Sequence, residues 1–92
     1  MIAEAVYLQA SQTVRFAIYP QDIDGPRVLA EISENALEEL FGADKHPKSW
    51  VSTCCVHFDF IKEVALQHYR SFPHLPISLR TIDFFLVSDA KT

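Results

Sequence analysis

A long amphipathic stretch, residues 47–71, limits the folds open to this chain more than any other segment. Pro47 suits the first position of a helix, where its missing N–H needs no partner, and Pro73 and Pro76 interrupt helical geometry beyond the other end. With the period of an α-helix, one face is apolar and the opposite face polar. The apolar arc holds Val51, Cys54, Cys55, Phe58, Ile61, Ala65, His68, Tyr69 and Phe72, and the polar side holds Ser52, Asp59, Glu63, Gln67 and Arg70. This pattern predicts one long helix that packs on a sheet.

The first third of the chain has the pattern of β-strands. Residues 3–8 are short and β-prone, and residues 13–19 alternate between apolar and polar side chains, which is the period of a half-buried strand. Pro20 to Pro26 contains Asp24-Gly25, a pair typical of chain reversal. Residues 28–32 then form the returning strand. These segments predict a meander in which one face carries Phe16, Ile18, Val28 and Ala30.

A short helix follows the meander. Ser33 supplies an N-cap oxygen, and Glu34 places an acid in the first turn, where the helix dipole favours it. Gly42 is its expected stop, because the residue after a helix often adopts a left-handed conformation. Its apolar stripe consists of Ala36, Leu37, Leu40 and Phe41.

The last apolar run, residues 77–87, is expected to be a strand that is either covered on both faces or set against a dimer partner. The chain is therefore predicted to be a single α+β domain spanning residues 1–92. An antiparallel β-meander precedes a short helix, a long helix and a C-terminal strand, in the order β-β-β-α-α-β. The helices are expected to pack on one face of the sheet.

Several strings resemble a family of small uncharacterised bacterial proteins, the domain of unknown function 1488. The shared strings are Val14-Arg15-Phe16, Asp24-Gly25, Ile32-Ser33 with Ala36-Leu37, Phe41-Gly42-Ala43, the helix positions Phe58, Ile61, Ala65 and Tyr69, and the closing Leu79-Arg80 and Asp83-Phe84. The segment before Val14 departs from the family pattern. The resemblance implies a compact α+β fold and brings no catalytic residues.

Composition restricts the partners of the chain. Its 92 residues are 49% hydrophobic, and a domain of this size hides only about 60–65% of its unfolded surface. A homodimer is expected, since such a small domain often buries surplus apolar surface against a copy of itself. The net charge of −4 disfavours nucleic acid. Neither a signal peptide nor an apolar run of about 18–20 residues, as a membrane span needs, is found, so no membrane partner is expected.

The two cysteines, Cys54 and Cys55, are adjacent. Their Cα atoms are about 3.8 Å apart, which is below the usual disulfide range that starts at about 4.4 Å. Free thiols indicate a reducing compartment, and a cytoplasmic location is expected.

Chemical sites are weakly indicated. Cys54 and His57 have the helical spacing of a metal or thiolate-imidazole pair, but His68 lies about 16 Å further along a helix and cannot join them. The alternative is buried structural cysteines beside an ordinary histidine. His57, His68, Tyr69 and Arg70 could line a pocket, or could be ordinary helix-end residues. No catalytic set, cofactor or metal is predicted.

Val56 and Phe60 fall off the apolar arc on the opposite side of the helix. They either pack under the meander or the short helix, or form a partner surface that Trp50 extends. The leading hypothesis is a non-enzymatic interaction or regulatory module that self-associates through the long helix and the last strand, with any other protein partner unknown. The rival hypothesis is a small ligand-binding protein or enzyme that uses Cys54, His57, His68, Tyr69 and Arg70.

Overall fold

Four strands form one mixed sheet in the computed structural model, which describes residues 5–21, 24–74 and 76–84. The strands are β1 (Val6–Leu8), β2 (Thr13–Ile18), β3 (Val28–Ser33) and β4 (Ile77–Leu79), and they lie in the order β1-β2-β3-β4. β1, β2 and β3 pair antiparallel, which confirms the meander. β4 pairs parallel to β3. The predicted start of the first strand at Ala3, and Asp22 of the predicted turn, lie outside the described residues.

The register of β2 and β3 places the apolar side chains on one face. Phe16 pairs with Ala30, and Ile18 pairs with Val28, so the four residues predicted to share a face do so. On the other face Arg15 pairs with Glu31, and their side chains form an ion pair at 3.2 Å. One face of the sheet is therefore apolar, and the other carries charge.

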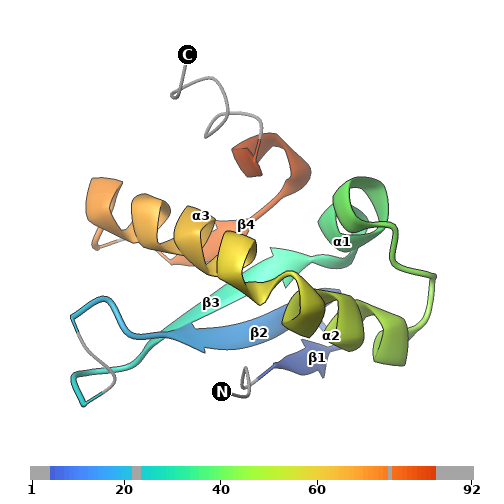
Figure 1. Cartoon of the computed structure of the whole chain (residues 1–92), viewed down its shortest axis with the longest axis horizontal. Coiled ribbons are helices and arrows are strands. Elements are labelled where there is room, and N and C mark those ends of the chain that lie inside the picture. The colour runs from blue at the N-terminus through green and yellow to red at the C-terminus, as the bar shows by residue number, and fades with distance from the viewer. Residues whose placement is uncertain (1–4, 22–23, 75, 85–92) are drawn as a thin grey trace.

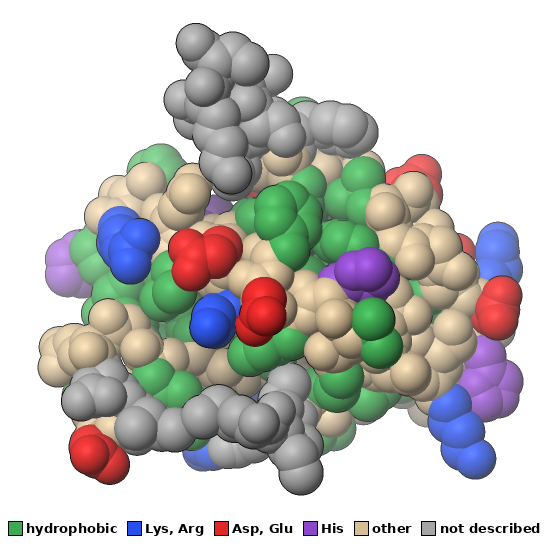
Figure 2. Space-filling view, in the orientation of Figure 1, with side chains coloured by type: hydrophobic (Ala, Val, Ile, Leu, Met, Phe, Trp, Pro, Cys, Tyr) green, Lys and Arg blue, Asp and Glu red, His purple; other side chains and the backbone are tan. Residues whose placement is uncertain are grey.

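Three helices lie together on one side of the sheet (Figure 1). They are α1 (Glu34–Phe41), α2 (Pro47–Val56) and α3 (Phe58–Ser71). α2 contacts β1 and β2, and α3 contacts β2 and β4. The α+β class and the packing of the helices on one sheet face are as predicted. In the same orientation, Figure 2 shows hydrophobic side chains at the surface near the junction of α2 and α3.

The ends of α1 follow the local sequence signals. Ser33 Oγ accepts a hydrogen bond of 3.1 Å from the N–H of Ala36. Gly42 closes the helix in the left-handed conformation, with φ of 75°. Both predicted caps are confirmed. Pro47 also takes its predicted place in the first turn of α2, where His46 Nδ1 accepts from the N–H of Lys48.

The predicted long helix is wrong in one respect, because it is divided at His57. His57 has φ of −100° and ψ of 21°, so α2 ends and α3 begins at this residue. The preceding residues 52–56 are serine, threonine, cysteine and valine, all modest helix formers. The break changes the phase of the apolar face. Cys55, expected on the buried arc, is exposed, and Val64, absent from that arc, is buried.

The last apolar run is also shorter as a strand than predicted. β4 ends at Leu79, and residues 81–84 form a helical turn in which Asp83 Oδ2 accepts from the N–H of Arg80 at 2.7 Å. This hydrogen bond caps the start of the helical turn and so favours the turn over a longer β4. Ile77 and Leu79 are buried while Ser78 is exposed, so β4 is not covered on both faces. Residues 85–87 of the predicted strand lie outside the described residues.

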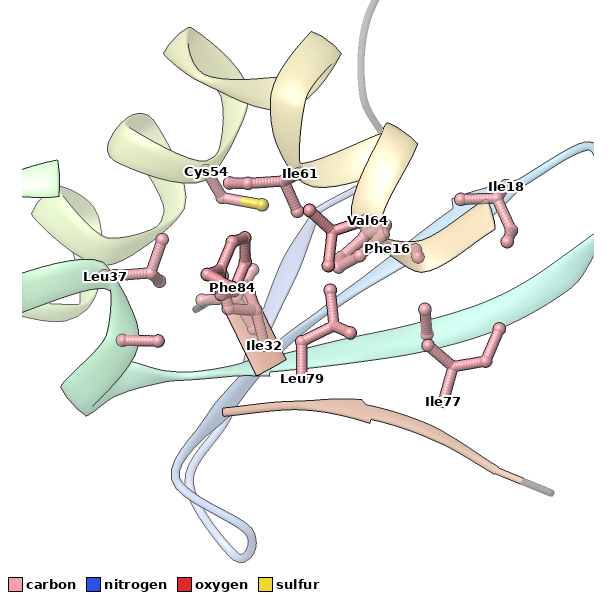
Figure 3. Close-up of a cluster of buried hydrophobic side chains, with 14 of the residues drawn as sticks. Phe16, Ile18, Ile32, Leu37, Cys54, Ile61, Val64, Ile77, Leu79 and Phe84 are labelled. Atoms are coloured by element: carbon pink, nitrogen blue, oxygen red, sulfur yellow. The ribbon is translucent and has the colours of Figure 1, made fainter. Parts of the chain in front are cut away.

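The core lies between the helices and the apolar face of the sheet (Figure 3). Its largest fully buried side chains are Phe16, Ile18, Ile32, Leu37, Ile61, Leu79, Val14, Val64 and Cys54. Apart from Ala17, the buried apolar side chains of the described residues form one cluster. Among the described residues, no helix has the length and hydrophobicity that crossing a bilayer requires.

Candidate functional site

Aromatic rings gather at the α2–α3 junction. Phe41 and His57 stack with centroids 4.7 Å apart and planes inclined by 30°. Phe84 lies 5.8 Å from Phe41 and 5.7 Å from Phe60, and Phe41 and Phe60 are 6.1 Å apart. These four rings and Val56, which directly precedes His57, are called the aromatic surface below. The distances fit the usual geometry of interacting rings.

Three segments that are distant in sequence supply this surface. Phe41 ends α1, His57 and Phe60 flank the start of α3, and Phe84 belongs to the helical turn at residues 81–84. Thr81 Oγ1 donates a 2.8 Å hydrogen bond to Oε1 of Glu39, which ties that turn to α1. The arrangement is therefore fixed by contacts between elements. Sequence reasoning missed Phe41 and Phe84 because both had been assigned to ordinary core or strand positions.

Three members of the aromatic surface, Val56, His57 and Phe60, remain open to solvent. Val56 is 74% exposed and Phe60 is 44% exposed, whereas Phe84 beside them is 4% exposed. Packing against the short helix accounts for part of Phe60, since its ring meets Phe41 of α1, but it does not account for Val56, which stays exposed. Apolar side chains exposed on a fixed aromatic base are typical of an interaction surface.

Trp50 does not extend this surface. It is 8% exposed, and its ring lies 4.9 Å from that of Tyr7 on β1. Its indole N–H donates to Oε2 of Glu38 at 2.8 Å. The residue instead joins the core, where it links α2 to α1 and β1.

Two unpaired carboxylates lie in α3 near the aromatic surface. Asp59 and Glu63 are both exposed on α3, and Glu63 lies one turn beyond Phe60. Neither carboxylate makes an ion pair with another described residue. Figure 2 shows acidic and basic side chains on one side of the hydrophobic group and a histidine on its other side. The surface thus has an apolar centre and a charged flank.

The residues of the predicted pocket do not converge. His57 begins α3, whereas His68, Tyr69 and Arg70 lie near its end, about 16 Å away along the axis. His68 lies 5.7 Å from the ring of Phe72, and its buried Nδ1 has no hydrogen-bond partner among the described residues. Tyr69 packs against the core and Arg70 is exposed. The structure does not bring the four side chains to one site.

The thiols are in opposite environments. Cys54 is fully buried, and burial, with a smaller contribution from the charge of Cys55, raises the pKa of its thiol to about 12. Cys55 is exposed. A protonated, buried Cys54 beside an exposed His57 does not make a thiolate-imidazole pair. Within the described part of the chain, no three His, Cys, Asp or Glu side chains form a group that could hold a metal ion.

Comparisons of the chain with protein-family models, with curated proteins and with solved structures give no significant match. The resemblance to the domain of unknown function 1488 therefore stays a prediction, carried by the strings quoted above.

Proposed function

We propose that this protein is a non-enzymatic interaction module that binds a second copy of itself through the aromatic surface. The observation that carries the proposal is the exposure of Phe60 on a base of packed rings, with exposed Val56 close by in the sequence, directly before His57. Covering these side chains removes apolar area from water, which favours association.

A second copy is a suitable occupant because the centre of the surface can face itself. A two-fold interface brings the same patch of both subunits together. The exposed centre consists of Val56, His57 and Phe60 and holds no lysine, arginine, aspartate or glutamate, so self-contact buries no pair of such charges there. Asp59 and Glu63 lie at the flank, where water can still screen their charge.

The interface is assigned to the helices alone. The sequence had indicated that the last strand would contribute, but Ile77 and Leu79 of β4 are buried in the core of their own chain. Only Ser78 of this strand is exposed, and it supplies little apolar area. The α2–α3 junction is therefore the place to test.

Sedimentation equilibrium at micromolar concentration tests the proposal. The wild-type chain is expected to be a dimer, and Phe60→Ser or Val56→Ser to be monomeric or at least about tenfold weaker in association, because each removes apolar area at the interface centre. Phe72→Ser is the matched control, since Phe72 is 53% exposed at the far end of α3. A monomeric wild type, or equal weakening by all three substitutions, would contradict the proposal.

We also infer a cytoplasmic location. Cys54 and Cys55 are both free, and their adjacency leaves no disulfide for an oxidising compartment to form within the described residues. Fractionation of cells that express the untagged chain tests this, with recovery outside the cytoplasm as the contrary result.

A further inference from the structure

No helix among the described residues covers one face of the sheet. The three helices lie on the opposite side (Figure 1), and side chains along each strand alternate between the two faces. The residues that we call the open sheet face are Val6, Arg15, Ala17, Leu29, Glu31 and Ser78. Val6 is 57% exposed and Leu29 is 47% exposed, so two large apolar side chains meet water here.

Strand pairing fixes the neighbours of each side chain on this face. In one row across the sheet, Arg15 of β2 lies between Val6 of β1 and Glu31 of β3. Ser78 of β4 completes the row beside Glu31. Arg15 and Glu31 form their ion pair at 3.2 Å with 44% and 25% of their side chains exposed. A charge pair of both signs therefore stands at the centre of the open sheet face.

We propose that the open sheet face is a second site of self-association, at which the sheets of two copies stack. The two-fold axis runs along the strands, midway between β2 and β3, in the plane between the sheets. It places β2 of each copy over β3 of the other. Arg15 then faces Glu31 of the second copy, so the four charges alternate in sign. This charge complementarity selects a second copy as the occupant.

The same axis matches side chains by size. Leu29 pairs with Ala17 in its own sheet, so the axis sets Leu29 over Ala17 of the second copy. Val6 and Ser78 lie on the two edge strands of one row, and the axis sets them over each other. Each large apolar side chain thus meets a small residue. Stacked sheets pack about 10 Å apart through such interleaved side chains.

This second association is expected to be weak. Four strands about 4.8 Å apart and rows three residues long span roughly 200 Å², whereas a standard interface buries about 800 Å² on each partner. The stacked dimer therefore needs millimolar rather than micromolar protein. The inference goes beyond the proposed function, because it uses the opposite side of the chain from the aromatic surface.

Charge reversal in a parent protein with Val56→Ser and Phe60→Ser tests the inference, because these changes weaken association at the aromatic surface. Sedimentation equilibrium at millimolar concentration is expected to find this parent dimeric. Adding Arg15→Glu makes every charge of the stack negative, and adding Glu31→Arg makes every charge positive. Each is expected to weaken the dimer at least about tenfold through repulsion of like charges.

An equimolar mixture of the two charge-reversal variants is the decisive sample. A negative face then meets a positive face, so heterodimers are expected with an affinity close to that of the parent. A role within one chain cannot give this recovery, because each variant lacks its internal ion pair. Arg70→Glu reverses an exposed charge on α3 and is the control, with unchanged affinity expected. A monomeric parent, or a mixture without heterodimers, overturns the inference.

A further variant guards against loss of the fold. Glu31→Arg also removes the acceptor of the 2.8 Å hydrogen bond from Thr13 Oγ1, so urea unfolding checks its stability. Leu29→Ser leaves that bond in place and is expected to weaken the parent dimer at least about tenfold by removing apolar area. Unchanged association of Leu29→Ser contradicts the stacked arrangement.

The two interfaces fail separately. If Phe60→Ser leaves micromolar association unchanged while the charge mixture recovers heterodimers, the proposed function is wrong and the stacked sheets stand. If Phe60→Ser abolishes a micromolar dimer and the parent stays monomeric at millimolar concentration, the aromatic surface stands and the stacked sheets are refuted.

Discussion

The indole N–H of Trp50 donates a 2.8 Å hydrogen bond to Oε2 of Glu38. This bond joins α2 to α1, two helices that follow each other in the chain across the loop between Phe41 and Pro47 and also contact each other. Tyr7 makes a parallel link, since its hydroxyl donates to Oε2 of Glu34 at 3.0 Å and its ring contacts Trp50. One side of α1 therefore accepts hydrogen bonds from side chains of both β1 and α2.

Replacing Glu38 should destabilise the fold through this bond. Glu38→Ala leaves the buried indole N–H without its acceptor, at a cost of about 1–3 kcal/mol in the free energy of unfolding. Glu38→Gln keeps an acceptor oxygen and should cost less. Urea unfolding followed by fluorescence measures both, because Trp50 is the only tryptophan. Equal stability of the alanine and glutamine variants would show that the bond contributes nothing.

Local signals predicted the elements that local interactions decide. Ser33 and Gly42 cap α1 as expected, because capping depends on side-chain and backbone groups within a few residues. The alternation through Val14 and Phe16 likewise predicted a strand with one buried face, since the period of a strand is a property of the strand itself.

The candidate surface was only partly predictable. Val56 and Phe60 stood out from the helical pattern, but the break at His57 has no proline or glycine to announce it. The prediction that Trp50 extends the surface was wrong, because the direction of its side chain depends on how α2 packs against β1. Phe84 joins the rings only because β4 pairs parallel to β3, and such distant pairing leaves no trace in a short window of sequence.

The two thiols should differ in reactivity. Cys55 is exposed, whereas Cys54 is buried and the pKa of its thiol is raised to about 12. At neutral pH the thiol of Cys54 is therefore neither accessible to a reagent nor ionised. A thiol-specific disulfide reagent should label one cysteine per folded chain and two in denaturant. Peptide mass mapping of Cys55→Ala should then find no fast label. Rapid labelling of that variant would contradict the buried position of Cys54.

Burial of Cys54 should also make stability fall in alkali. The pKa of the thiol is near its ordinary value of 9.0 in the unfolded chain and about 12 in the fold. Between these values the unfolded chain has released a proton that the folded chain keeps, so stability is lost as pH rises, by up to about 1.4 kcal/mol per pH unit.

The difference between two variants isolates this contribution. Cys54→Val should lose less stability than the wild type between pH 9 and 11, while Cys55→Val should follow the wild type. Tyr7, whose pKa is raised by desolvation and then by Glu34, is present in all three proteins and cancels in the comparison. Parallel stability curves for the two valine variants would contradict the assignment to Cys54.

The turn between β1 and β2 offers a site for stabilisation. Gln12 has a positive φ of 57°, in the left-handed region that costs a residue with a Cβ about 1 kcal/mol. Its carbonyl oxygen accepts a 3.1 Å hydrogen bond from the N–H of Glu34 at the start of α1, so the conformation is held by a contact between two elements. Gln12→Gly keeps that carbonyl and removes the steric cost.

The glycine variant should therefore unfold at a higher urea concentration, with a gain of up to about 1 kcal/mol. Gln12→Val should lose stability instead, because a β-branched side chain tolerates this region least. Gln9 lies in the same turn without a positive φ, so Gln9→Gly is the matched control and should destabilise slightly through added freedom of the unfolded chain. A gain from Gln9→Gly equal to that from Gln12→Gly would show that the left-handed backbone of Gln12 is not the source of the effect.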